Sequence, residues 1–120
     1  MRAVVGTMGG DSQPQVVLQL LARLLHAGQS PAQAVGSGRW RLAGSNPSGF
    51  HTWTAPDDVR VQVEGHSGPV DADLEQRGHR VERLAPHFSG FGHAHLIDID
   101  GEVLAGASDP RALTGGVSGY

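Results

Sequence analysis

The beginning of the chain constrains its fold most strongly, because a short apolar run, a glycine-rich turn and an amphipathic segment follow one another directly. Residues 3–6 are typical of a short buried strand. The turn spans residues 6–11, and Pro14 then suits the first turn of a helix, where its missing N–H costs nothing. Apolar residues recur at helical spacing and define one face of this helix: Val17, Leu20, Leu21, Leu24 and Leu25. Gly28 ends the helix, so the sequence predicts a strand and a helix joined by a tight turn.

The rest of the chain alternates between short helices and short strands. We expect helices over 31–35, capped by Ser30, and over 69–77, capped by Ser67, and strands over 39–42, 59–64, 79–84, 92–99 and 102–106, with a brief strand pairing over 50–53. The Asp100-Gly101 pair predicts a tight hairpin between the last two strands. The sequence has no repeat and no linker. It therefore predicts one α+β unit over residues 1–120, an antiparallel sheet with helices on one face.

The composition excludes several classes of protein. With 120 residues the chain forms one domain at most, and its formal charge of −3 argues against a nucleic-acid partner. The absence of cysteine excludes disulfides, thiolate nucleophiles and thiolate metal sites. No apolar run approaches the roughly 20 residues of a membrane span, and the first residues turn polar too soon for a signal peptide. We expect no nucleic-acid or membrane partner, and the composition leaves the compartment open.

The glycine-rich turn is the first candidate for chemistry. It lies between a strand and the N-terminus of a helix, where backbone N–H groups and the helix dipole favour an anion or a developing oxyanion. Gly9 and Gly10 lack Cβ atoms and so allow a ligand to approach the backbone closely. The turn is not a P-loop, because no Gly-Lys-Ser/Thr follows it. An anion site and a plain strand–helix turn both remain open on the residues alone.

The histidines raise the possibility of a metal site. His93 and His95 are two residues apart in a predicted strand, so they share one face, which is a geometry that zinc sites use. A third ligand would come from His51, His79 or His87, which the sequence does not place. The alternative is a pair of solvated or hydrogen-bonded histidines, with no metal.

Two charged groups also require an interpretation. Arg39 and Arg41 share one face of a predicted strand and are expected to pair with carboxylates for structural reasons. The acidic residues near the predicted hairpin, Asp98, Asp100 and Glu102, lack the spacing of a calcium loop and are expected to form a solvated turn.

No Gly-x-Ser-x-Gly occurs, so nothing marks a serine as an activated nucleophile.

Both ends of the chain resemble one family. Residues 6–15 (Gly-Thr-Met-Gly-Gly-Asp-Ser-Gln-Pro-Gln) and residues 106–111 (Gly-Ala-Ser-Asp-Pro-Arg), with the final Gly-Tyr, resemble the C-terminal part of the gamma-glutamyltransferase (gamma-glutamyltranspeptidase) small subunit. Residues 30–35 are similar to that family's Pro-x-x-Ala helix, and residues 38–40 resemble its Pro-Arg-aromatic step with glycine in place of proline. The resemblance covers essentially the whole chain.

The resemblance implies a fold and a mechanism. The fold is the four-layer αββα sandwich of N-terminal-nucleophile hydrolases, of which this chain would form a part. In such an enzyme a threonine freed at the N-terminus of the small subunit attacks a γ-glutamyl amide, such as that of glutathione. Water or an acceptor amine then resolves the acyl-enzyme. Two consecutive glycine N–H groups form the oxyanion hole, and Gly9 and Gly10 match them. No cofactor is implied.

The resemblance also implies what these residues lack. The family's nucleophilic threonine and its paired serines precede the glycine turn, whereas Thr52 and Thr54 follow it. Cleavage before either threonine would separate Gly9 and Gly10 from the new N-terminus. We therefore expect the chain alone to be inactive. Its expected partners are the remainder of the small subunit, the large subunit and, once assembled, the γ-glutamyl substrate.

Several alternatives remain at this point. Apolar faces that the rest of the sandwich would cover predict self-association of the isolated chain. A second interpretation is a stand-alone, non-catalytic binding or assembly module of the same half-fold, and a third is a small zinc protein built on His93 and His95. Hydrolysis and transfer are not distinguished. The family is often periplasmic or extracellular, but a cytoplasmic location is equally compatible with the sequence.

Overall fold

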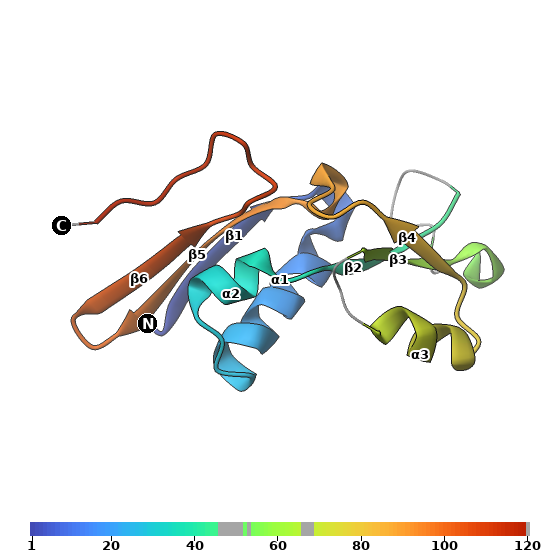
Figure 1. The fold of residues 1–120 in the computed structure, drawn as a ribbon, viewed down its shortest axis with the longest axis horizontal. Coiled ribbons are helices and arrows are strands. Elements are labelled where there is room, and N and C mark those ends of the chain that lie inside the picture. Colours follow the sequence, from blue (N-terminus) through green and yellow to red (C-terminus); the bar gives the residue numbers. More distant parts are fainter. Residues whose placement is uncertain (46–51, 53, 66–68, 120) are drawn as a thin grey trace.

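The computed structural model describes residues 1–45, 52, 54–65 and 69–119, and these form two small sheets with helices beside them (Figure 1). The first sheet has the order β1-β5-β6, and the second has the order β2-β3-β4. The strands are β1 (Ala3–Met8), β2 (Trp40–Ala43), β3 (Arg60–Glu64), β4 (Val81–Leu84), β5 (His93–Asp100) and β6 (Val103–Ser108). The helices are α1 (Gln13–Leu21), continued by a π-helical turn (Ala22–His26), α2 (Pro31–Gly36) and α3 (Val70–Gln76). The α+β class is confirmed.

The first sheet is antiparallel throughout and has α1 and α2 on one face, as the sequence predicts (Figure 1). Its last two strands form the expected hairpin, in which Asp100 pairs with Val103 and Gly101 takes a positive φ of 60°. The turn residues are therefore Gly101 and Glu102, one position later than the Asp-Gly signal places them. The core lies between this sheet and the two helices: Val16, Leu20, Leu24, Ala34, Val35, Ala94, Leu96 and Ala107.

The helices largely follow their local signals. Ser30 caps α2 through a capping box, in which its hydroxyl accepts from the Gln33 N–H and its own N–H donates to the Gln33 side chain. Gly28, with φ of 65°, follows the end of the first helix, as predicted. The buried face of that helix is rotated from the expected one, because Val16 is fully buried while Leu25 is exposed. Packing against the first sheet, rather than the count of apolar residues, decides which side of this helix is covered.

The second sheet differs from the single antiparallel sheet that the sequence predicts. β2 and β3 are antiparallel, but β3 and β4 run parallel, with Val61 opposite Val81. A parallel pair needs a crossover connection, and α3 lies within that connection. The expected pairing over 50–53 and the Ser67 cap fall mostly or wholly outside the described residues.

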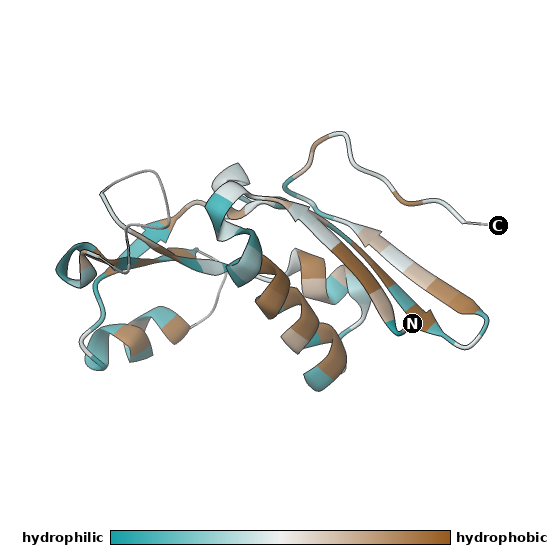
Figure 2. Cartoon of the chain, turned by 180° about the vertical axis from the view of Figure 1, so that it is seen from behind, coloured by the Kyte–Doolittle hydropathy of each residue, from teal (hydrophilic) through white to brown (hydrophobic). Residues whose placement is uncertain are grey.

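The face of the first sheet that points away from α1 and α2 carries four apolar side chains that are at least one-third exposed. Val4, Met8, Ile97 and Leu104 have exposed fractions of 48%, 64%, 36% and 68%. The C-terminal segment runs along this side, and Figure 2 shows hydrophobic strand residues beneath it. We call Val4, Met8, Ile97 and Leu104 the outer face.

Within the described part of the chain, no helix is long and apolar enough to cross a membrane.

Candidate functional site

The glycine turn joins β1 to α1 and has the backbone that its sequence requires. β1 ends at Met8, and a single 3₁₀ turn, η1 (Gly10–Ser12), leads into α1. Gly10 has φ of 52°, a left-handed conformation in which a Cβ atom would be strained. No atom lies within 4 Å of the position that a Cβ would take at Gly10, so this side of the turn is open to an approaching group.

The direction of one N–H group in this turn is fixed by a hydrogen bond. The Ser12 N–H donates to the Gly9 carbonyl oxygen at 3.0 Å. That carbonyl belongs to the same planar trans peptide as the N–H of Gly10, so the two groups point in opposite directions. Holding the Gly9 oxygen toward Ser12 therefore directs the Gly10 N–H away from the start of the helix.

A third glycine, Gly92, lies against the turn at the start of β5, and the sequence did not single it out. Gly92 precedes β5 and has φ of 80°. A Cβ there would stand 2.7 Å from the Thr7 hydroxyl oxygen and 2.9 Å from the Met8 carbonyl oxygen, both closer than real contacts allow. A Cβ on Gly9 would in turn lie 3.5 Å from the Gly92 Cα. The two glycines thus permit the start of β5 to pack against the turn.

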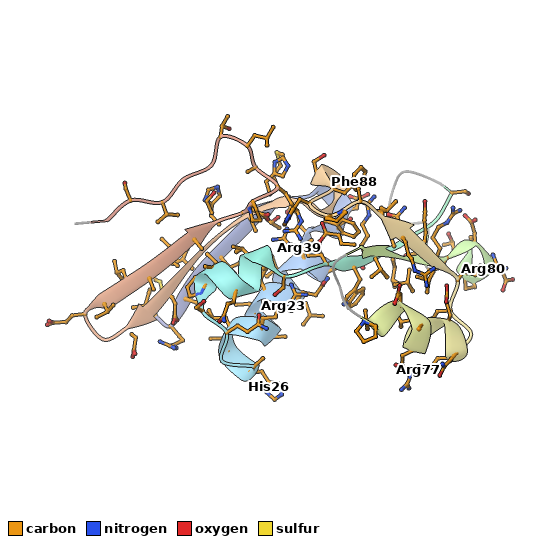
Figure 3. The ribbon with its side chains drawn as sticks, in the orientation of Figure 1. Arg23, His26, Arg39, Arg77, Arg80 and Phe88 are labelled. Atoms are coloured by element: carbon orange, nitrogen blue, oxygen red, sulfur yellow. The ribbon has the colours of Figure 1, made fainter. Side chains whose placement is uncertain are left out.

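Four buried charges connect the two sheets, and one of them, Arg39, is labelled in Figure 3. Arg39 pairs with Asp109 at 2.5 Å, Arg111 pairs with Asp109 at 2.9 Å, and the Arg111 Nε donates to Glu64 at 2.8 Å. All four side chains have an exposed fraction of 0%. Two positive and two negative charges balance, and burial of this kind is tolerated only when each charge is paired and hydrogen-bonded. We call Arg39, Glu64, Asp109 and Arg111 the buried ion cluster.

The buried ion cluster holds the backbone that leads into β5. The Arg39 guanidinium donates to the carbonyl oxygens of Phe91 and Gly92 at 2.9 and 3.1 Å, and Asp109 accepts from the Ala94 N–H at 2.9 Å. Burial disfavours the charged Asp109, but hydrogen bonds from the Arg111 backbone and the charge of Arg39 outweigh it and hold the pKa of this carboxyl below its usual range. The cluster thus fixes the segment that packs behind the turn.

The two arginines that the sequence grouped together differ in their partners. Arg39 pairs with a carboxylate, as predicted. Arg41 instead donates to neutral acceptors, the side chain of Gln62 at 2.7 Å and the carbonyl oxygen of Gly90 at 2.5 Å. Arg41 thus has structural partners, as expected, but the groups that it hydrogen-bonds are neutral, because the neighbouring strand places an amide opposite it: Gln62 is its partner in the β2–β3 register.

His93 and His95 line one cavity of about 580 Å³ beside the first sheet, which confirms that they share a face. Residues of β1 and of the C-terminal segment complete its lining: Gly6, Thr7, Met8, Ala112, Thr114, Gly115 and Gly116. Among the residues that the structure describes, no three metal-binding side chains come together. His79 lines a different pocket beside the second sheet, and His51 falls outside the described residues. The zinc interpretation has no third ligand among them.

The acidic residues near the hairpin are engaged at the surface. The Arg2 guanidinium lies 3.3 Å from Asp98 and 3.9 Å from Asp100, and it donates to the Ile99 carbonyl oxygen at 2.6 Å. Exposed pairs of this kind contribute at most about 1 kcal/mol. Asp100 and Glu102 are exposed at the hairpin, as the sequence predicts, whereas Asp98 belongs to β5 and its side chain is only 18% exposed.

The fold and the comparisons with known proteins define the class of this protein. The structure superposes on the gamma-glutamyltranspeptidase of Pseudomonas nitroreducens with a TM-score of 0.70 at 22% identity, over 99% of this chain and 56% of that one. It superposes on cephalosporin acylase from Bacillus halodurans with a TM-score of 0.68 at 28% identity, over 89% of this chain and 18% of that one. The fold is thus that of the gamma-glutamyltranspeptidase group of N-terminal-nucleophile hydrolases.

The family follows from the sequence comparisons. The profile of the family described as Gamma-glutamyltranspeptidase matches residues 1–119, so the chain belongs to this family. The chain is 34% identical over 119 residues to an oxamate amidohydrolase proenzyme of Klebsiella pneumoniae, covering 98% of this chain and 21% of that protein. It is 31% identical over 112 residues to the glutathione hydrolase-like YwrD proenzyme of Bacillus subtilis, covering 92% and 20%. The chain therefore spans about a fifth of the length of these curated relatives.

Proposed function

We propose that this chain is the C-terminal segment of a gamma-glutamyltranspeptidase-like hydrolase and that Gly9 and Gly10 donate their N–H groups to the oxyanion of an amide-cleavage reaction. The geometry of the turn carries the proposal. The hydrogen bond from Ser12 to Gly9 directs the Gly10 N–H away from the helix, and the left-handed Gly10 has open space where a Cβ would lie. One donor in such a site typically contributes about 2.7–4 kcal/mol to transition-state stabilisation.

The reaction that these donors would serve is acyl transfer through a covalent intermediate. A threonine hydroxyl oxygen attacks the amide carbon, and the carbonyl oxygen becomes the anion that the glycine N–H groups stabilise. The C–N bond then breaks, the amine leaves with a proton, and water or an acceptor amine cleaves the ester. The nucleophile in this proposal lies ahead of the turn in the intact enzyme, as the family resemblance implies. The 120 residues alone would therefore not cleave the amide.

The names of the relatives narrow the substrate class to small amides. One relative is named an oxamate amidohydrolase and the other a glutathione hydrolase-like protein. We propose a γ-glutamyl amide or another short acyl amide as the substrate of the assembled enzyme. The residues that hold the acyl group lie mostly ahead of this segment, by the same family resemblance.

The outer face supports a partner that belongs to the same enzyme. An apolar sheet surface formed by Val4, Met8, Ile97 and Leu104 is a surface that another layer normally covers. We propose that the remainder of the small subunit and the large subunit cover it. A polar, charged outer strand edge would favour the alternative of a stand-alone binding module, whereas an exposed apolar face, as these four residues form, favours the segment of a larger enzyme.

The test compares the amide-cleaving activity of the purified chain with that of the intact enzyme. The purified chain should release no p-nitroaniline from γ-glutamyl-p-nitroanilide and no ammonia from oxamate, and release of either would contradict the proposal. The genomic reading frame that contains these residues, expressed with its upstream DNA, should process itself at a threonine and cleave one of the two amides. Gly10→Ala in that protein should lower kcat at least about tenfold, because the left-handed turn no longer directs the N–H correctly.

A further inference from the structure

Arg41 of β2 contacts both short turns that border the glycine turn. Its terminal nitrogen donates to the Gly90 carbonyl oxygen at 2.5 Å and to the Ser12 hydroxyl oxygen at 3.4 Å. Ser12 closes η1, two residues after Gly10, and Gly90 belongs to the 3₁₀ turn η5 (Ser89–Phe91) that precedes Gly92. The guanidinium also lies 5.5 Å from the centre of the Phe91 ring. One side chain thus connects the turn to the segment that packs behind it.

The direction of the Arg41 side chain is itself fixed by its neighbours. Its Nε donates to the Gln62 side-chain oxygen at 2.7 Å, and the Gln62 nitrogen donates to Glu82 at 2.9 Å. On the other side, Gln19 of α1 donates to the Trp40 carbonyl oxygen at 2.8 Å and accepts from the Trp40 N–H at 3.1 Å. The strand that carries Arg41 is therefore attached to α1, and its guanidinium has a single defined direction.

Fixing Ser12 has a consequence for the glycine turn. The Ser12 N–H holds the Gly9 carbonyl oxygen, and the planarity of that peptide sets the direction of the Gly10 N–H. A displaced Ser12 would rotate the peptide and turn this donor. We propose that Arg41 is a positioning residue that directs the Gly10 N–H by holding Ser12 on one side and Gly90 on the other. The inference rests on the proposed function of Gly10.

The direct test is the backbone amide spectrum of the full 120-residue chain, compared between Arg41→Met and Arg77→Met. Arg77 pairs with the exposed Asp73 of α3, which is not one of the residues that hold Arg41, so its replacement is a matched control. Arg41→Met should shift the Gly10 and Ser12 amide resonances and speed hydrogen exchange at Ser12 by about tenfold, as loss of one hydrogen bond predicts. The amides of Val63 and Leu96, in the two sheets, should exchange at the wild-type rate.

Two outcomes would overturn the inference. The first is an unchanged Gly10 resonance in Arg41→Met, and the second is an exchange rate that rises evenly across both sheets, which a purely structural role would produce. If Arg41→Met does not fold, Gln62→Leu keeps the guanidinium and removes the side-chain acceptor of its Nε together with the Gln62–Glu82 hydrogen bond. The same local change at Gly10 and Ser12 would then support the inference, and its absence would overturn it. Because this measurement does not depend on activity, an inactive enzyme would contradict the proposed function and leave the positioning result unaffected.

Discussion

The guanidinium of Arg39 and the carboxylate of Asp109 lie 2.5 Å apart, and neither side chain is exposed to solvent. Asp109 belongs to the closing Asp-Pro-Arg sequence, and Arg39 directly precedes β2. Their pairing therefore joins the C-terminal part of the chain to the second sheet. Arg39 also donates to Phe91 and Gly92, so the same contact supports the segment behind the glycine turn.

Asp109→Asn should be strongly destabilising. The substitution removes the carboxylate that pairs with the buried guanidinium of Arg39 and leaves Arg111 with Glu64 as its ion-pair partner, and breaking a buried pair costs about 3–5 kcal/mol. Urea unfolding of the two proteins measures the difference in the free energy of unfolding. Asp73→Asn serves as the control, because it removes an exposed pair with Arg77 and should cost less than about 1 kcal/mol. Equal losses in the two variants would contradict the role of the buried ion cluster.

The same carboxyl predicts a pH dependence of stability. The pKa of Asp109 is lower in the folded protein than in the unfolded chain, so the unfolded state binds more protons as the pH falls. The stability that this group contributes is fully present above the unfolded pKa of about 3.9 and is lost as the pH falls through the lower folded value. Urea unfolding at several pH values should show a decline below about pH 4. That decline should be shallower in Asp109→Asn, and an identical slope would exclude Asp109 as its source.

Gly92→Ala tests the packing behind the turn. With φ of 80° and a new Cβ only 2.7 Å from the Thr7 hydroxyl oxygen, the variant should lose about 1–3 kcal/mol of stability. Thermal unfolding followed by circular dichroism gives the change in Tm. Gly36→Ala is the matched control: Gly36 has open space around its missing Cβ and lies in α2, where alanine is favoured. A Tm of Gly92→Ala equal to or above that of the wild type would contradict the close packing of β5 against the turn.

The outer face predicts concentration-dependent association of the isolated chain. Sedimentation velocity should show oligomers that disappear in the double variant Met8→Lys, Leu104→Lys, because charges on a paired apolar surface must be desolvated. Leu25→Lys changes an equally exposed leucine on the helix side and should leave the oligomers intact. A wild-type chain that stays monomeric at high concentration would remove the basis for the prediction.

Local signals predicted the parts of the fold that local interactions determine. The first strand, the glycine turn, the Ser30 cap and the final hairpin each depend on residues close in sequence, and all four are present. The parallel pairing of β3 with β4 depends on how α3 returns the chain, which no local pattern encodes.

The candidate site was predictable only in part, for a similar reason. The glycine turn carries a local signal, but the buried state of Glu64 does not. An alternating strand places Glu64 with the polar residues, whereas Arg111, distant in the sequence, brings it into the interior. Gly92 is likewise recognisable only once β5 is known to lie against β1. Contacts of this kind need a three-dimensional arrangement that composition and periodicity do not contain.

The location of Asp109 and Arg111 has a consequence for how the chain is made. A ribosome synthesises Arg39 and Glu64 before Asp109 and Arg111, the residues with which they pair. During synthesis, the charges of Arg39 and Glu64 must therefore stay hydrated until residues 109–111 have been added. A nascent chain halted before residue 109 would lack these buried ion pairs between the two sheets, so synthesis of residues 109–111 is the step that allows the buried ion cluster to form.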